Sequence, residues 1–327
     1  MSADRKDDGD NNSTMCCAGC GIAGVDDVKL KRCACKLVQY CGIECQREHR
    51  PKHKKECKKR IVELRDELLF KQPESSCMGD CPICCLPLPI DHKQLCLMPC
   101  CGHCICQGCY YANQKREKER RLEHKCPFCR VTFDLKSQKN SESNLMKRVE
   151  ANSKSERQMM KRVEANDPFV TGQMGYRLNQ AGDHSGAIEY WTKAAGLGDM
   201  HSHFNLSVKY KLGQGVDKDE KKYLYHSEQA AIGGHPHARH NLGCFEEENG
   251  RMDRAVKHWI IAANMGQDHA LDALKKSYRD GLVSKEDFAA ALRAHQAAVD
   301  ATKSPQRDIA VSIANGSFKG SQAERRR

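Results

Sequence analysis

Hydrophobic positions in the second half of the chain recur at helical spacing, and the segments that carry them repeat. The segments "DHSGAIEYWTKAAGLG" and "MDRAVKHWIIAANMG" place apolar residues on one helical face and end in glycine, which favours helix C-termini. Stretches at 194–207, 230–243 and 262–275 align on a pair of alanines, a glycine four residues later and a histidine seven later, at steps of 36 and 32 residues. Steps of this size are typical of stacked helix pairs, each buried against its neighbours.

The repeats predict an all-α domain over residues 168–302. We expect helix pairs at roughly 168–198, 199–234, 235–266 and 267–302. The repeated histidines His201, His237 and His269 have two interpretations, a ladder of metal ligands or packing in the turn between repeats, and we favour packing.

Four further segments are predicted from local pattern. Ile61, Leu64 and Leu68 have helical spacing, which predicts a helical linker over 58–76 that stops near Pro73. Residues 131–167 are a charged helical linker in which "MKRVEAN" occurs at 146–152 and again at 160–166, and we interpret this as a local duplication. The polar ends, 1–15 and the basic tail 303–327, are expected to be disordered.

Cysteine usage is uneven along the chain. Of 21 cysteines, 20 lie between Cys16 and Cys129, mostly in closely spaced pairs. The N-terminus lacks the apolar segment of a signal peptide, and we find no run long enough to span a membrane. We therefore expect a reducing compartment, cytoplasmic or nuclear, in which such pairs hold zinc rather than form disulfides.

The formal net charge of +11 makes acidic partners conceivable. The basic runs at 49–60 and 115–121 are not interleaved with aromatic residues, as a surface that stacks single-stranded nucleic acid would be. We interpret them as solvated helix faces, so nucleic-acid binding is the weakest functional hypothesis.

The first cysteine-rich segment, 16–57, contains enough soft ligands for two closed zinc sites. Cys41 and Cys45 are four residues apart, as are His53 and Cys57, so each pair lies on one face of a helix. The spacing is C-x2-C-x12-C-x1-C-x5-C-x3-C-x7-H-x3-C, over Cys17, Cys20, Cys33, Cys35, Cys41, Cys45, His53 and Cys57.

This segment resembles a MYND finger, most clearly in "YCGIECQREHRPKHKKEC". Two departures are the single residue Ala34 between the third and fourth ligands, and Arg50 at the family's usual tryptophan. The resemblance implies a module that binds proline-containing peptides without catalysis. It also implies interleaved sites, Cys17, Cys20, Cys41 and Cys45 on one zinc ion and Cys33, Cys35, His53 and Cys57 on the other.

The second cysteine-rich segment, 77–130, resembles a RING finger. Its spacing is C-x2-C-x16-C-x1-H-x2-C-x2-C-x16-C-x2-C, over Cys81, Cys84, Cys101, His103, Cys106, Cys109, Cys126 and Cys129. Taken in order, the ligands form four pairs. The resemblance implies that the first and third pairs share one zinc ion and the second and fourth share another. With the two ions of the first segment, this gives four zinc ions per chain. Cys100 is the serious rival of Cys101, and Cys77, Cys85, Cys96 and Cys104 are surplus.

The RING resemblance also implies a docking surface for a ubiquitin-conjugating enzyme. Its contacts would be Ile83, Pro127 and Arg130. Only Tyr110 and Tyr111 lie near the position where many active RING fingers have tryptophan. Because the zinc ions are saturated by protein ligands, any catalysis would be by positioning the ubiquitin thioester.

The repeats resemble Sel-one-like repeats, relatives of the tetratricopeptide repeat, most clearly in the turn "GQGVDKD" at 213–219. The assembled order resembles a group of algal multidomain proteins. The sequence thus predicts small zinc-stabilised modules, MYND and then cross-braced RING, followed by an all-α helical-repeat solenoid. The first functional hypothesis is a ubiquitin ligase whose MYND finger and repeats bind proteins, and the alternative is a non-catalytic zinc-binding adaptor.

Overall fold

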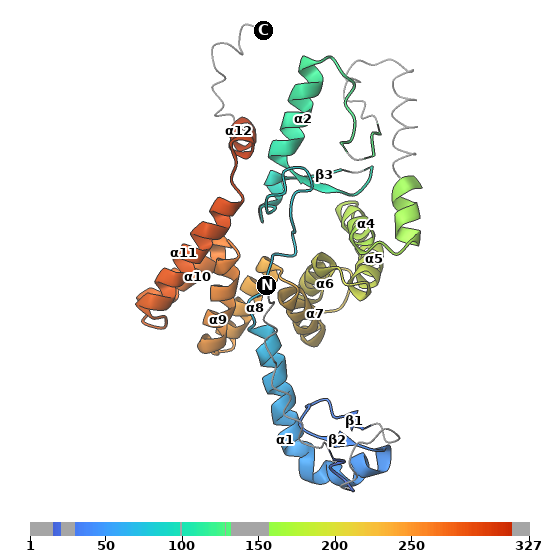
Figure 1. The fold of residues 1–327 in the computed structure, drawn as a ribbon, viewed down its shortest axis with the longest axis vertical. Helices are drawn as coiled ribbons and strands as arrows, with labels where there is room; N and C mark the ends of the chain where they lie inside the picture. Colours follow the sequence, from blue (N-terminus) through green and yellow to red (C-terminus); the bar gives the residue numbers. More distant parts are fainter. Residues whose placement is uncertain (1–15, 21–29, 99, 128, 132–156, 316–327) are drawn as a thin grey trace, which may run out of the picture. The chain divides into compact units, whose positions relative to one another are not determined.

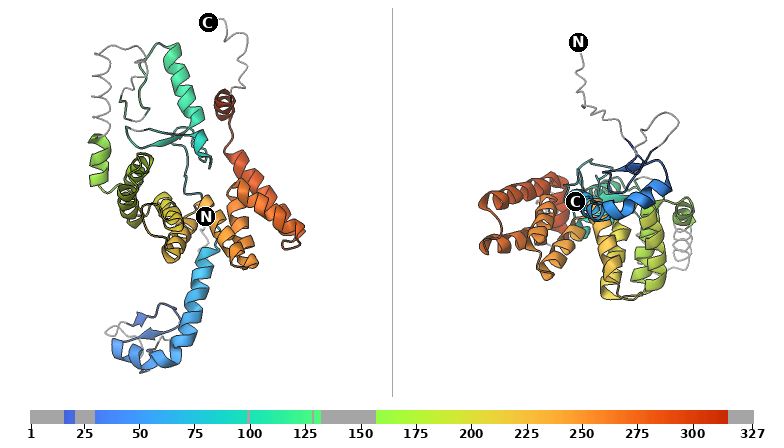
Figure 2. Two further views of the ribbon diagram at one scale, coloured as in Figure 1. Left: turned by 180° about the vertical axis from the view of Figure 1, so that it is seen from behind. Right: turned by 90° about the horizontal axis from the view of Figure 1, so that it is seen from below.

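The protein is described from a computed structural model, which covers residues 16–20, 30–98, 100–127, 129–131 and 157–315. It divides into two compact units, Met1–Lys71 and Gln72–Arg327. Figures 1 and 2 show the elements of each unit. The predicted disordered N-terminus, 1–15, and the first "MKRVEAN" copy lie outside the described residues.

The first unit is a small sheet beside one long helix. Strands β1 (Lys31–Arg32) and β2 (Gln39–Tyr40) pair antiparallel, and a bridge joins Cys17 to Gln39. Helix α1 (Ile43–Leu69) follows directly. The helical half of the finger and the predicted linker helix are therefore one continuous helix, rather than two elements.

The second unit begins with a module that we call the second cysteine module, residues 77–131. It contains the 3₁₀ helix η1 (His92–Gln94), strands β3 (Leu95–Leu97) and β4 (Cys104–Cys106), which pair antiparallel, and helix α2 (Gln107–Glu119). Its core is mostly sulfur. The buried cluster consists of Cys81, Leu88, Met98, Cys100, Cys101, Ile105, Cys106, Cys109 and Cys126.

Four helix pairs form the repeat domain. The pairs are α4 (Pro168–Gln180) with α5 (His184–Gly196), α6 (Met200–Leu212) with α7 (Glu220–Ile232), α8 (Pro236–Glu248) with α9 (Met252–Asn264), and α10 (Asp268–Arg279) with α11 (Lys285–Ala301). Helices that follow one another in the chain lie side by side (Figures 1 and 2). This arrangement is a helical solenoid.

The aligned glycines explain how each pair leads to the next. Gly198, Gly234 and Gly266 all have φ between 81° and 94°, a left-handed conformation that ends the preceding helix. The residue after each glycine caps the next helix: the side chains of Asp199, His235 and Gln267 accept hydrogen bonds from backbone N–H groups three residues later. The repeat seen in the sequence is therefore a repeated stop-and-cap turn.

Two tryptophans form the core of the first and third pairs in the same way. Trp191 of α5 packs on Gly175 of α4, and Trp259 of α9 packs on Gly243 of α8. A methyl group at Gly243 would lie 2.3 Å from the Trp259 Nε1. Each pair thus depends on a glycine that lets the indole ring approach the backbone.

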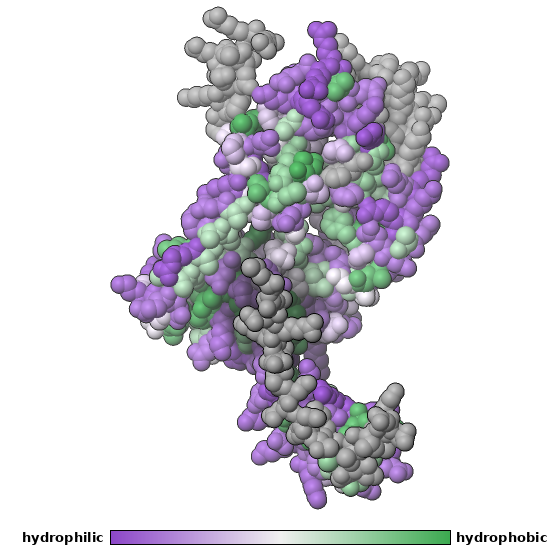
Figure 3. Space-filling model, viewed as in Figure 1, coloured by the Kyte–Doolittle hydropathy of each residue, from purple (hydrophilic) through white to green (hydrophobic). Residues whose placement is uncertain are grey.

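Hydrophilic residues cover most of the face shown in Figure 3.

The second "MKRVEAN" copy is part of the fold rather than a linker. Residues 157–164 are helical, and Met159 and Val163 are buried against Val170 of α4. Arg162 forms an ion pair with Asp167, the residue that caps α4.

The predicted disordered tail, 303–327, contains a helix. Helix α12 (Pro305–Ala314) begins with Ser304 as its cap and Pro305 in its first turn, and it packs against α2 of the second cysteine module. Its Arg307 is only 4% exposed, and the guanidinium group donates hydrogen bonds to the carbonyl oxygens of Pro87, Leu86 and Thr302. These buried bonds order a segment whose composition predicts disorder.

Candidate metal centres

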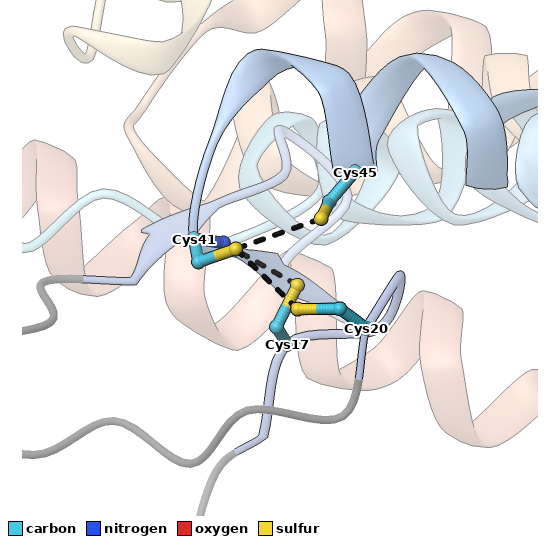
Figure 4. A group of neighbouring side chains, drawn as sticks. All are labelled: Cys17, Cys20, Cys41 and Cys45. Carbon is cyan, nitrogen blue, oxygen red and sulfur yellow. Dashed lines mark hydrogen bonds between the residues drawn. The ribbon is translucent and has the colours of Figure 1, made fainter.

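The first group of ligands joins the N-terminal segment to the start of α1. It consists of Cys17, Cys20, Cys41 and Cys45, whose sulfur atoms lie within 4.8 Å of one another (Figure 4). The Sγ of Cys41 is 3.5 Å from that of Cys20 and 3.5 Å from that of Cys45. The Cys41 backbone N–H also donates to the Cys17 Sγ, at 3.4 Å. Hydrogen bonds from the backbones of Cys20 and Cys41 lower the pKa of Cys17 to about 6, which favours the thiolate.

The second group lies further along the same helix. It consists of Cys33, Cys35, His53 and Cys57. The Cys35 Sγ is 3.0 Å from the His53 Nε2, and the Cys33 Sγ is 3.5 Å from the Cys57 Sγ. His53 is buried, and its ring stacks on that of His49. The single residue between Cys33 and Cys35 therefore does not prevent both sulfurs from reaching one site.

The third and fourth groups interleave along the second cysteine module. The third consists of Cys81, Cys84, Cys106 and Cys109, and the Cys84 Sγ is 3.8 Å from that of Cys106. The fourth consists of Cys100, Cys101, Cys126 and Cys129. The Cys101 Sγ is 3.5 Å from that of Cys126, and the Cys100 Sγ is 3.2 Å from that of Cys129. Each group thus takes one couple from each half of the module.

The sulfur positions fit zinc. The cysteines of all four groups are free, and the sulfur–sulfur distances given above are 3.2–3.8 Å, too long for a disulfide. Two thiolates on one tetrahedral zinc ion lie about 3.8 Å apart, given a Zn–S bond of about 2.3 Å. Zinc would supply the folding free energy that these small apolar clusters lack.

The structure differs from the predicted ligands at His103. The His103 side chain is exposed and lies outside the fourth group, where Cys100 takes its place. A tight turn is the cause. The Met98 N–H donates to the His103 carbonyl oxygen at 2.8 Å, and the N–H of Gly102, which has φ of 70°, donates back to the Met98 carbonyl at 2.7 Å. This turn directs Cys100 and Cys101 into the core and His103 to the surface.

An arginine of α12 reaches the third group, and no motif in the sequence indicates it. The Arg307 guanidinium donates to the Cys84 Sγ at 3.3 Å. Burial alone would raise the pKa of Cys84, but hydrogen bonds from the Leu86 backbone and from Arg307 lower it to about 7. The Ser-Pro pair at the start of the helix could have predicted a helix N-terminus, but not the contact of the helix with the second cysteine module.

The surplus cysteines have different positions. Cys85 is exposed, whereas Cys96 of β3 and Cys104 of β4 are half-buried against the sulfur core. Burial raises the pKa of both Cys96 and Cys104 to about 11, so these thiols stay protonated. Of the described cysteines outside the four groups, Cys77 alone joins another cluster, with His201 and His235.

The three residues predicted to contact a conjugating enzyme all lie at the surface. Ile83 is 43% exposed between Cys81 and Cys84, and Pro127 is exposed between Cys126 and Cys129. Arg130 is exposed in a left-handed conformation, with φ of 59°, and its N–H donates to the Cys126 carbonyl oxygen. Ile83 therefore lies between two ligands of the third group, and Pro127 lies between two ligands of the fourth.

Comparison with known proteins identifies the first module. Residues 17–57 match the family model described as MYND finger. The match and the first two ligand groups, which lie within it, support zinc binding by this segment. No curated protein matches the chain. Among the helices of the described residues, none is both long and apolar enough to cross a membrane.

Two solved structures are similar to part of the chain. A protective antigen of uropathogenic Escherichia coli with an SLR fold is 26% identical, with a TM-score of 0.38, over 45% of this chain and 33% of that chain. The chain thus spans about a third of the antigen's length. A Sel1 repeat protein from Oxalobacter formigenes is 24% identical, with a TM-score of 0.39, over 53% of this chain and 75% of that chain.

Proposed function

We propose that this zinc-binding interaction protein is a RING-type ubiquitin ligase or ligase subunit. The observation that carries the proposal is the cross-bracing of the second cysteine module, in which Cys81 and Cys84 group with Cys106 and Cys109, while the intervening Cys100 and Cys101 group with Cys126 and Cys129. A RING finger has this order of couples. The MYND finger and the repeat domain would recruit the substrate protein.

The chemistry is catalysis by positioning. With four cysteines around each zinc ion of the second cysteine module, no coordination position is left for water, so the metal would have no catalytic role of its own. The exposed Ile83 and Pro127 would dock the conjugating enzyme through apolar contact. The exposed guanidinium group of Arg130 would donate hydrogen bonds to ubiquitin and hold its thioester in a reactive conformation.

A non-catalytic adaptor is the second candidate, and two observations favour it. Tyr110, one of the two aromatic residues nearest the usual tryptophan position, is half-buried with its ring edge-on to His124. Helix α12 also packs along α2, and its Arg307 donates to the Sγ of Cys84, the residue after Ile83. In this account all three modules would bind proteins without transferring ubiquitin.

An autoubiquitination assay with a panel of conjugating enzymes separates the two candidates. We expect activity with at least one enzyme, and at least a tenfold loss in Ile83→Ala and in Arg130→Ala, because each removes a docking contact without touching a zinc ligand. Zinc content should stay at the wild-type value in both variants.

Leu122→Ala and Arg121→Ala are matched controls. Leu122 is exposed in the same module, and Arg121 is exposed with φ of 53°, close to that of Arg130. Both controls should keep wild-type activity. A wild-type chain that is inactive with every enzyme, or Ile83→Ala and Arg130→Ala variants as active as the controls, would establish the adaptor instead.

A further inference from the structure

Three residues far apart in the sequence meet outside the four finger groups. Cys77 precedes the first ligand of the second cysteine module by four residues, His201 is the second residue of α6, and His235 caps α8. Their ligand atoms all lie within 4.8 Å of one another. The cluster therefore joins the start of the second cysteine module to two different helix pairs of the repeat domain.

The geometry of this cluster is close to that of a metal site. The Cys77 Sγ lies 3.9 Å from the His201 Nε2, and the rings of His201 and His235 are 5.1 Å apart and nearly perpendicular. A thiolate and an imidazole on one tetrahedral zinc ion lie about 3.5 Å apart, given bonds of about 2.3 Å and about 2.0 Å. A movement of a few tenths of an ångström would close the difference.

The backbone holds Cys77 against the repeat domain. Its N–H donates to the carbonyl oxygen of Gly234 at 3.1 Å, one residue before His235. Gly234 has φ of 81°, and a methyl group there would lie 2.6 Å from the carbonyl oxygen of Ser75. The contact between the two segments is thus set by main-chain groups, independently of the three side chains.

Little solvent reaches the two histidine rings. His235 is 2% exposed, and His201 is half-buried. The His235 Nδ1 accepts only a long hydrogen bond, 3.3 Å from the Ala238 nitrogen. Coordination through Nε2 would place the ring proton on Nδ1 and give up this one bond.

We propose that Cys77, His201 and His235 bind a fifth zinc ion. One thiolate and two imidazoles are ligands that zinc prefers, and three protein ligands leave one position for water. The Asp199 carboxylate lies nearby and adds a negative charge that favours a cation. The ion would fasten the start of the second cysteine module to helices α6 and α8.

Zinc content of the purified full-length chain tests this site. We expect Cys77→Ser and His201→Gln each to contain about one zinc ion fewer than the wild-type protein. Cys96→Ser and His237→Gln are matched controls. Neither Cys96 nor His237 belongs to a ligand group within the described part of the chain, so both variants should keep the wild-type zinc content. Far-UV circular dichroism should be the same in all five proteins.

Cobalt substitution gives a second readout. Replacing zinc with Co²⁺ and comparing the wild-type spectrum with that of Cys77→Ser should show the loss of one thiolate-to-cobalt contribution. Unchanged zinc content in both Cys77→Ser and His201→Gln would overturn the proposal. Loss of two or more ions in both would also overturn it, because the cluster would then support a finger site rather than bind its own ion.

Discussion

Cys106→Ser is expected to unfold the second cysteine module while the repeat domain stays folded. Cys106 ends β4, its N–H donates to the Cys81 Sγ at 3.4 Å, and its own Sγ accepts from the Cys109 N–H at 3.4 Å. A structural zinc ion contributes about 10 kcal/mol or more to folding. That is as large as the whole stability of a typical domain, about 5–15 kcal/mol. Because the two groups interleave, losing one ion releases both halves.

Hydrogen exchange measures this effect. In the Cys106→Ser chain, amides of β3, β4 and α2 should exchange as fast as unfolded peptide, and those of α4 to α9 should keep their protection. Cys96→Ser is the control, because Cys96 pairs with Ile105 in the same two-stranded sheet and lies outside the four finger groups. Persistent protection over 104–119 in Cys106→Ser would show that zinc does not hold this module together.

Trp259→Ala should give the second-largest loss, about 3–5 kcal/mol in the free energy of unfolding of the repeat domain. The Trp259 side chain is 2% exposed and lies against Gly243, with Ala255, Ala262 and Leu274 in the same buried cluster. Since glycine has no side chain to fill the space, the substitution leaves a cavity between α8 and α9.

Urea unfolding followed by fluorescence measures this loss. The chain has 2 tryptophans, so Trp191 remains as the reporter in the variant. Leu292→Ala is the control, because Leu292 is 46% exposed on α11 and its truncation should cost less than about 1 kcal/mol. A Trp259→Ala curve that overlays the control would contradict the packing described for the third helix pair.

Much of the repeat domain follows from local sequence signals. The alanine pairs, the left-handed glycines such as Gly234 and the capping residue after each glycine all act within one turn of chain. Spacing likewise places Cys41 beside Cys45 and His53 beside Cys57, because residues four apart share a helix face. These features could be predicted because the physics that sets them is local.

The remaining features depend on contacts between distant residues. Spacing cannot decide between Cys100 and His103, because the choice depends on how the Met98–His103 turn directs its side chains. Helix α12 was missed because charge and composition predict disorder, whereas the buried bonds of Arg307 to Pro87 order it. The cluster of Cys77 with His201 depends on a contact across 124 residues.

Native mass spectrometry of intact chains tests the central claim, that eight cysteines cross-brace the second cysteine module. The Cys77→Ser background removes the proposed fifth site, so about four zinc ions are expected there. Adding His103→Ala should leave four, because His103 is exposed and outside the ligand groups. Adding Cys100→Ser should reduce the count to about two, because losing one of the two interleaved ions releases both halves of the module. A chain that keeps four ions after Cys100→Ser and loses one after His103→Ala would contradict the account.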